Sequence, residues 1–257
     1  MRHKLTSQEI ASYRENGFLA VEDFLTAAEL EHWREVVDAA VVDRHVKLLP
    51  QTNSKTVFTQ RMHLRRTSAG VQQLVEDGAV GQLVAELEGV DAVRIYFDQA
   101  LVKEPYFAPT QYHLDMPWWA FDSRHACTIW VALDDSTLEN GCLYFVPGSH
   151  LLGLTRAGDL GPGLGGVLAA HPDAAVPPTP CPIPAGGCTF HNGRTIHGAG
   201  ANMTPGRRRA LTAAYMPDGV RFNGRRDANV LGEGYLDELT EGDRLANDEL
   251  NPVVYSR

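Results

Sequence analysis

Three residues from two distant segments have the types and spacing of a metal site. His113 and Asp115 stand two residues apart, and His197 follows far along the chain. On a strand, residues two apart point to the same face, so the first two side chains would lie a few ångströms apart. Two imidazoles and one carboxylate on one face of a metal form the facial triad of non-haem Fe(II) oxygenases, which leaves positions open for a co-substrate and O2. These three residues are therefore candidate ligands of Fe(II).

A second His-x-Asp pattern, at residues 171–173, shows that the spacing alone is not specific. Its middle residue, Pro172, cannot donate to a sheet ladder, and the surrounding stretch is rich in Gly, Pro and Ala. Polar and apolar residues alternate before His113, and Pro117 follows, which is typical of the end of a strand. We interpret the second pattern as chance. For His113 itself, spacing leaves a metal ligand and a coincidence equally open.

Several blocks around these residues resemble the phytanoyl-CoA dioxygenase family. They cover residues 97–103, 110–115, 128–135, 139–150 and 190–202, occur in the family's order, and are followed by Arg208. Residues 5–25 also resemble the family's N-terminus, so the resemblance extends from there to about Pro217. It implies an Fe(II)- and 2-oxoglutarate-dependent oxygenase that also consumes O2.

The resemblance also implies roles for single residues. The family's distal metal ligand is the histidine followed by Gly-x-Gly-x-Asn, which favours His197 over its rival His191. The family's arginine eleven residues further on binds the far carboxylate of 2-oxoglutarate, and here that residue is Arg208. Gln99 and Trp130 are expected to line the same pocket.

Three consecutive arginines occur at this position, Arg207, Arg208 and Arg209, and one of them is expected to bind the carboxylate. A guanidinium binds a carboxylate through two parallel hydrogen bonds and stays charged when buried. On a strand, Arg208 faces opposite to its neighbours, for which a solvated edge is the simpler explanation. Lys103 belongs to a family block but would also suit a solvated position, and Gln60 aligns too loosely with a polar position of the family to be assigned.

The elements that must position these side chains follow a helices-first order. Capping boxes at Thr6 and Thr26 predict helices that run to Asn16 and to about Lys47, and apolar residues predict a third helix over 71–87 that ends at Gly89. Period-two patterns then predict strands at 93–97, 128–133, 142–146, 187–190 and 209–215. This order predicts a mainly β fold with flanking α-helices. The resemblance makes its core a double-stranded β-helix, the cupin-like jelly roll.

We expect one domain over residues 1–257. It comprises a mostly helical part (1–90), the jelly-roll core (91–217) and a charged C-terminal wrap (218–257). A long Gly/Pro/Ala-rich loop over 151–184 is a possible cover over the active site. The G-x-G-x-x-G pattern at 161–166 is not preceded by a strand, and too few residues for the required helix follow it, so we reject nucleotide binding there.

Bulk composition narrows the functional class. A net charge of −9 and a pI near 5.5 argue against nucleic acid or an anionic membrane as partner. The N-terminus lacks the apolar core of a signal peptide, and no stretch is apolar enough to cross a bilayer. The four cysteines show no CxxC spacing and fit reduced thiols of a cytoplasmic protein. The sequence leaves the oligomeric state open.

The predicted reaction is oxidation of an unactivated C–H bond, by hydroxylation or oxidative cyclisation, with release of succinate and CO2. Because Asp115 is present, oxygen transfer is favoured over halogen transfer, for which related enzymes lack this carboxylate. We expect a small-molecule substrate, as in natural-product or antibiotic tailoring.

The residues that would contact such a substrate are less clearly indicated. The aromatic residues Trp118, Trp119 and Phe121 suit either the mouth of a pocket or the core. For His63, Arg65 and Arg66 a surface role is favoured over substrate contact. The alternatives are a metal-dependent cupin enzyme that does not use 2-oxoglutarate and a non-catalytic jelly roll that binds a small molecule.

Overall fold

The computed structural model describes residues 1–42, 57–154, 164–172, 176–226 and 234–257. The strands of its larger sheet are β1 (Phe18–Val21), β2 (Thr59–Met62), β3 (Ala92–Lys103), β5 (Cys127–Ala132), β8 (Cys188–Asn192), β10 (Arg208–Pro217) and β11 (Val253–Ser256). Those of its smaller sheet are β4 (Thr110–His113), β6 (Leu143–Phe145), β7 (Thr179–Cys181) and β9 (His197–Ala199).

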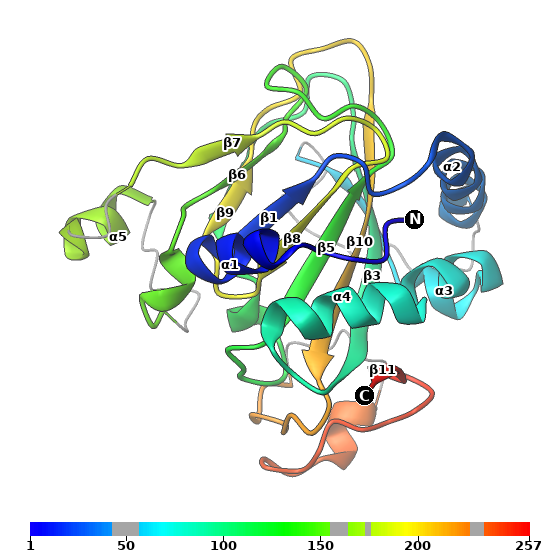
Figure 1. Cartoon of the computed structure of the whole chain (residues 1–257), viewed down its shortest axis with the longest axis vertical. Coiled ribbons are helices and arrows are strands. Elements are labelled where there is room, and N and C mark those ends of the chain that lie inside the picture. Colours follow the sequence, from blue (N-terminus) through cyan, green and yellow to red (C-terminus); the bar gives the residue numbers. More distant parts are fainter. Residues whose placement is uncertain (43–56, 155–163, 173–175, 227–233) are drawn as a thin grey trace.

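All strand pairs within the two sheets are antiparallel. The larger sheet has the order β1-β8-β5-β10-β3-β11, with β2 also paired to β3, and the smaller one has the order β4-β9-β6-β7 (Figure 1). Neighbours in both sheets are distant in sequence, so residues from remote segments are brought side by side.

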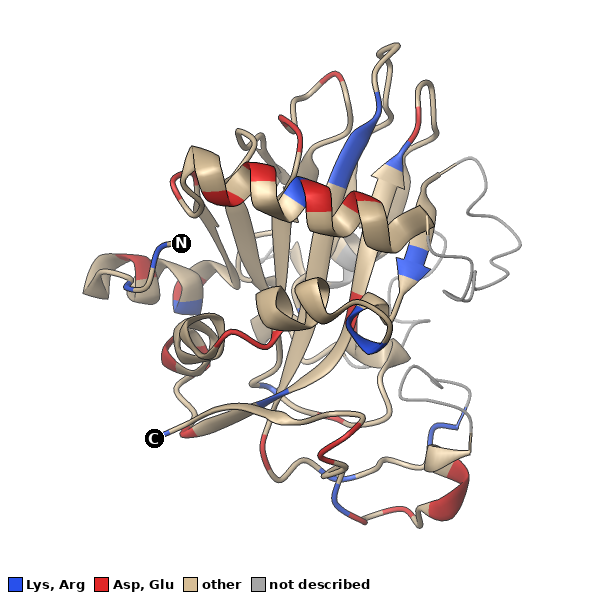
Figure 2. Cartoon of the chain, turned by 90° about the vertical axis from the view of Figure 1, so that its right-hand side faces the viewer, with Lys and Arg blue, Asp and Glu red and all other residues tan. Residues whose placement is uncertain are grey.

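Helices flank this core, as predicted. The α-helices are α1 (Ser7–Asn16), α2 (Ala27–Val42), α3 (Ala69–Val75), α4 (Gly78–Glu88) and α5 (Leu164–Ala170), and the short 3-10 helices are η2 (Leu64–Arg66), η3 (Met116–Trp118), η4 (Ser149–Leu151) and η7 (Tyr235–Glu238). Helices lie across the outer face of the larger sheet (Figure 2). Among the described helices, none combines the length and apolarity that a membrane crossing requires.

Alternate side chains of β5 pack against the helices on one face of the larger sheet and against the smaller sheet on the other. Ile129 and Val131 pack in one apolar cluster with residues of α2, α3 and α4. Trp130 and Ala132 face the other way and share a cluster with Phe145 of the smaller sheet. Both faces of this strand are therefore buried, and its inner face looks into the space between the sheets.

The local signals in the N-terminal part are confirmed with one exception. Thr6 caps α1 in a capping box, and α1 ends at Gly17, whose φ of 80° suits glycine. The prediction of a single helix over 71–87 is wrong, because the chain breaks between α3 and α4. Asp77 accepts a hydrogen bond from the backbone N–H of Ala79 and so starts a new helix, which ends at Gly89 as predicted.

Several predicted boundaries are also corrected. The strand predicted at 93–97 continues to Lys103, and the C-terminal segment is more than a wrap, because β11 pairs with β3. The segment 151–184 contains α5 and β7 and is not a continuous loop. Parts of five predictions lie outside the described residues. These parts are the end of the second helix near Lys47, residue 173 of the second His-x-Asp pattern, residues 161–163 of the glycine pattern, residues 155–163 and 173–175 of the loop over 151–184, and residues 227–233 of the C-terminal wrap.

Candidate metal centre

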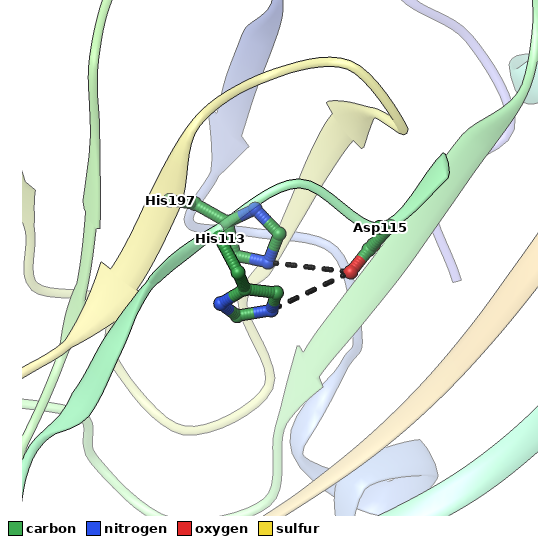
Figure 3. A group of neighbouring side chains, drawn as sticks. All are labelled: His113, Asp115 and His197. Atoms are coloured by element: carbon green, nitrogen blue, oxygen red, sulfur yellow. Dashed lines mark ion pairs between the residues drawn. The ribbon is translucent and has the colours of Figure 1, made fainter. Parts of the chain in front are cut away.

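The three predicted metal ligands lie together in the structure. His113 ends β4 and His197 begins β9, and the two residues are paired directly across the antiparallel strands. Their Nε2 atoms lie 3.6 and 3.7 Å from Oδ1 of Asp115, respectively. One ligand atom from each residue lies within 4.8 Å of the others, and Figure 3 shows the three side chains facing one another. A small metal ion fits between such a donor set.

Asp115 reaches this position for a different reason from the one predicted. It lies beyond the end of β4, with φ −75° and ψ −44°, at the start of the turn that forms η3. The backbone N–H of Trp118 donates to its carbonyl at 3.0 Å. A turn, and not the alternation of a strand, therefore brings the carboxylate beside the histidines.

Backbone contacts orient both imidazoles. Nδ1 of His113 lies 2.9 Å from the carbonyl oxygen of Gln111, and Nδ1 of His197 lies 3.0 Å from that of Thr195. Because a carbonyl only accepts hydrogen bonds, Nδ1 carries the proton in each ring and Nε2 presents its lone pair to the centre. Burial, together with the neighbouring His113, lowers the pKa of His197 to about 3. The neutral ring that a metal requires is therefore favoured.

The carboxylate of Asp115 is held from its other side as well. Its Oδ2 accepts a hydrogen bond from the Thr128 hydroxyl at 3.0 Å and lies 3.3 Å from Nε2 of His191. Burial alone would raise the pKa of Asp115, but His197, His113 and His191 hold it well below its usual range. Asp115 is therefore ionised. His191, the rival ligand, contacts the oxygen that faces away from the other two imidazoles.

Arg208 lies on the inner face of the larger sheet, and none of the described residues forms an ion pair with it. It begins β10, is only 3% exposed, and its guanidinium lies 5.0 Å from the ring centroid of Trp130. Its Nε and Nη1 atoms are buried, and neither has a hydrogen-bond partner in the part of the chain that the structure describes. Burial lowers its pKa to about 10, so it remains charged at neutral pH. A buried, unpaired guanidinium is costly unless an anion binds it, and a carboxylate matches its geometry.

The neighbouring arginines face the other way, as strand alternation predicts. Arg209 donates to Asp134 and Asp38 at 2.6 to 2.9 Å. Arg207 is half exposed and lies 3.8 Å from Asp38. Both positions are thus satisfied by the protein itself, and Arg208 differs from them.

Gln99 and Trp130 lie on the same inner face as Arg208. Strand register places Gln99 opposite Thr212, and Thr212 opposite Trp130, so the three form one row across β3, β10 and β5. Gln60 of β2, which could not be assigned from the sequence, donates from its amide to Oε1 of Gln99. The structure therefore brings these predicted residues to one side of the sheet.

Lys103 is fully buried, so the alternative of a solvated lysine is wrong. It stands opposite Arg208 in the sheet, and its Nζ donates to the carbonyl oxygens of Val57 and Ala108. Burial and the nearby guanidinium lower its pKa to about 8. Because these backbone contacts satisfy the ammonium group, Lys103 is less available than Arg208 to an incoming carboxylate.

The aromatic residues after Asp115 were expected either at the mouth of a pocket or in the core, and the structure contains both kinds of position. Trp119 and Phe121 are buried around Tyr96 and belong to the core. Trp118 is 61% exposed and lies in η3, directly after the metal site.

The prediction that Arg65 lies at the surface is wrong. Its side chain is buried and forms an ion pair with Glu76.

Comparison with known proteins decides the family. The family model described as phytanoyl-CoA dioxygenase (PhyH) matches residues 13–210. The chain belongs to the phytanoyl-CoA dioxygenase family. The predicted resemblance and the predicted dioxygenase class are thereby confirmed.

Relatives of this family member cover nearly its whole length. It is 26% identical to the methylphosphonate hydroxylase of Gimesia maris over 95% of this chain and 88% of that protein. It is similar to the non-haem α-ketoglutarate-dependent carbocyclase SnoK from nogalamycin biosynthesis, with 26% identity, a TM-score of 0.82, and 97% and 96% of the two chains covered. The epimerase SnoN, solved with Fe3+, α-ketoglutarate and nogalamycin RO, gives 29% identity, a TM-score of 0.80, and coverage of 96% and 97%. These matches confirm the jelly-roll fold and the predicted pairing of iron with 2-oxoglutarate in this class of enzyme.

Proposed function

We propose that this family member is an Fe(II)- and 2-oxoglutarate-dependent dioxygenase that oxidises an unactivated C–H bond of a small molecule and releases succinate and CO2. His113, Asp115 and His197 would hold the iron. Arg208 would bind the far carboxylate of 2-oxoglutarate, with Gln99 and Trp130 beside it. The observation that carries the proposal is the buried guanidinium of Arg208, two of whose nitrogen atoms have no hydrogen-bond partner among the described residues. Arg208 lies on the face of the larger sheet from which Thr128 and His191 contact Asp115.

Each proposed residue has a physical task. When bound, iron with 2-oxoglutarate and O2 supplies the oxidising power for the C–H bond. The triad occupies one face of the metal and leaves the other positions to co-substrate and O2. Arg208 fixes the far carboxylate by two parallel hydrogen bonds, and the indole of Trp130 keeps water away from the guanidinium face.

The substrate we propose is a small natural product, modified by hydroxylation or oxidative cyclisation. Support comes from the similarity to SnoK and SnoN, both from nogalamycin biosynthesis. Trp118 is the aromatic side chain of its segment that remains available for contact with a substrate. We also propose a single catalytic domain in the cytoplasm, because helices and larger sheet share one apolar cluster and the four cysteines are free and buried.

A metal-dependent cupin enzyme that does not use 2-oxoglutarate is the main alternative, ahead of a non-catalytic binding protein. Neither alternative gives a reason for burying Arg208 where no described residue supplies an anionic partner. The test is anaerobic titration of Fe(II) and 2-oxoglutarate into apo-protein, followed by the visible metal-to-ligand charge-transfer band.

We expect the band in the wild type, no band in Asp115→Ala, and a band that requires far more 2-oxoglutarate in Arg208→Ala. Tight iron binding by the wild type without any band would overturn the 2-oxoglutarate proposal and favour the cupin alternative. Absence of iron binding would overturn the metal site itself.

A further inference from the structure

We propose that Thr128 and His191 are positioning residues that select which oxygen of Asp115 faces the metal. The inference rests on the proposed role of Asp115 as a metal ligand. It assigns a task to two side chains of the larger sheet that lie outside the triad, one of which the sequence presents only as a rival ligand.

The two residues form a pair in the sheet. Thr128 of β5 and His191 of β8 stand directly opposite each other in the antiparallel register. Both side chains point inward, away from the helices, and both are buried, with exposed fractions of 5% and 2%. They reach across the space between the sheets to Asp115, which follows the last residue of β4. The metal centre is thus built from two cross-strand pairs, one in each sheet, with Asp115 between them.

The contacts divide the two carboxylate oxygens of Asp115. Oδ1 lies 3.6 and 3.7 Å from the Nε2 atoms of His113 and His197. Oδ2 lies 3.0 Å from the Thr128 hydroxyl and 3.3 Å from Nε2 of His191. With Oδ2 engaged by two donors, Asp115 would offer the metal a single oxygen. The position that a second carboxylate oxygen would occupy then stays open.

This support is needed because of where Asp115 lies. It stands in a turn beyond the strand, so no strand alternation fixes the direction of its side chain. The larger sheet supplies the missing constraint through two donors on rigid, buried strands. Groups that orient a metal-bound carboxylate in this way commonly contribute 10- to 100-fold to metal affinity, as a rough range.

The donors also suit the chemistry of the carboxylate. A threonine hydroxyl and an imidazole with its proton on Nε2 both donate to an anion without adding charge. In that tautomer Nδ1 of His191 carries no proton, and this atom is buried with no hydrogen-bond partner among the residues described. Two neutral donors hold Asp115 in place and leave its negative charge to balance the metal.

The test is titration of Co(II), a spectroscopic substitute for Fe(II), into the full-length apo-protein without 2-oxoglutarate. Thr128→Val and His191→Leu remove one donor each, while Thr128→Ser and His191→Gln keep one. Thr189→Val is the matched control, since Thr189 is a similarly buried residue of β8 whose hydroxyl makes no hydrogen bond to any described residue. Thermal unfolding of each apo-protein checks that it is folded.

We expect Thr128→Val and His191→Leu to bind Co(II) roughly 10- to 100-fold more weakly, with an altered visible d–d spectrum. The Ser and Gln variants should retain near-native affinity and spectrum, and the control should match the wild type. Native affinity and spectrum in both donor-deleting variants would overturn the inference while the proposed function stands, and so would an equal loss in the control or in the Ser and Gln variants. No Co(II) or Fe(II) binding by the wild type would instead overturn the proposed metal site.

Discussion

The two faces of the larger sheet differ in whether their arginine side chains have acidic partners. Arg208 and Arg209 are adjacent on β10, and strand alternation sends them to opposite faces. On the outer side, Arg209 is paired with Asp134 and Asp38. On the inner side, the described residues supply Arg208 with no acidic partner, and two of its nitrogen atoms lack a hydrogen bond to any of them. A buried cation that stabilises the fold is expected to have an acidic partner within the protein. Burying a cation without such a partner costs free energy, so an unpaired one indicates a binding site for an anionic ligand.

The carboxylates show the same contrast. Glu88, on the helix side, is buried and receives hydrogen bonds from the Tyr13 hydroxyl and the Asn192 amide. Burial raises its pKa to about 8, so it is largely protonated at neutral pH. Asp115, between the sheets, is kept ionised by three imidazoles. The protein neutralises the carboxylate that lies in its core and keeps the charge on the one at its proposed metal site.

The largest effect is expected between the sheets. His197→Ala should weaken Fe(II) binding by more than roughly 100-fold, because it removes a ligand and not only a group that orients one. His171→Ala, in the second His-x-Asp pattern, should leave the affinity unchanged. Anaerobic iron titration measures both. Equal losses in the two variants would contradict the selection of one pattern over the other.

Exchanging the inner arginine should separate ligand binding from stability. We expect Arg208→Met to raise the 2-oxoglutarate concentration needed for the charge-transfer band by about 100-fold, since a charged partner is lost. The apo-protein should be at least as stable as the wild type, because an unpaired buried charge has been removed. Urea unfolding measures the second effect, and a clearly destabilised apo-protein would show that Arg208 is structural.

On the outer side, Glu88 should make stability depend on pH. Its pKa is raised on folding, so between the unfolded value near 4.5 and about 8 the folded state holds the extra proton and stability falls as pH rises. The contribution changes by about 2 kcal/mol between pH 6 and 7.5. Urea unfolding of wild type and Glu88→Gln at both values isolates it. The same slope in the two proteins would contradict the raised pKa.

The smallest effect is expected for the outer arginine. Arg209→Met should lower the free energy of unfolding by about 1 to 3 kcal/mol, because it removes the side-chain hydrogen bonds to Asp134 and Asp38 and leaves Asp134 with the more distant Arg34, 3.9 Å away. Its affinity for 2-oxoglutarate should stay close to that of the wild type. A large loss of 2-oxoglutarate binding in Arg209→Met would contradict the assignment of 2-oxoglutarate binding to the inner face alone.

Local signals were sufficient for much of the fold. The capping boxes at Thr6 and Thr26 and the terminal glycines place helix ends, because they satisfy backbone groups within a few residues. The break at Asp77 was missed, since apolar spacing continues through it and only the cap shows where the second helix begins. Short strands such as β1 and β11 carry too few residues for a period and depend on their partners in the sheet.

The sequence by itself determined the residue types of the site. It supplied His113, Asp115, His197 and an arginine at position 208 that faces opposite to its neighbours, and its blocks predicted the family. Only the tertiary structure decided how they meet. A turn places Asp115, register between distant strands pairs the histidines, and the larger sheet brings Thr128 and His191 to its second oxygen. The physical reason is that periodicity records which face a residue takes, whereas contacts between strands far apart in the chain depend on the closure of the whole fold.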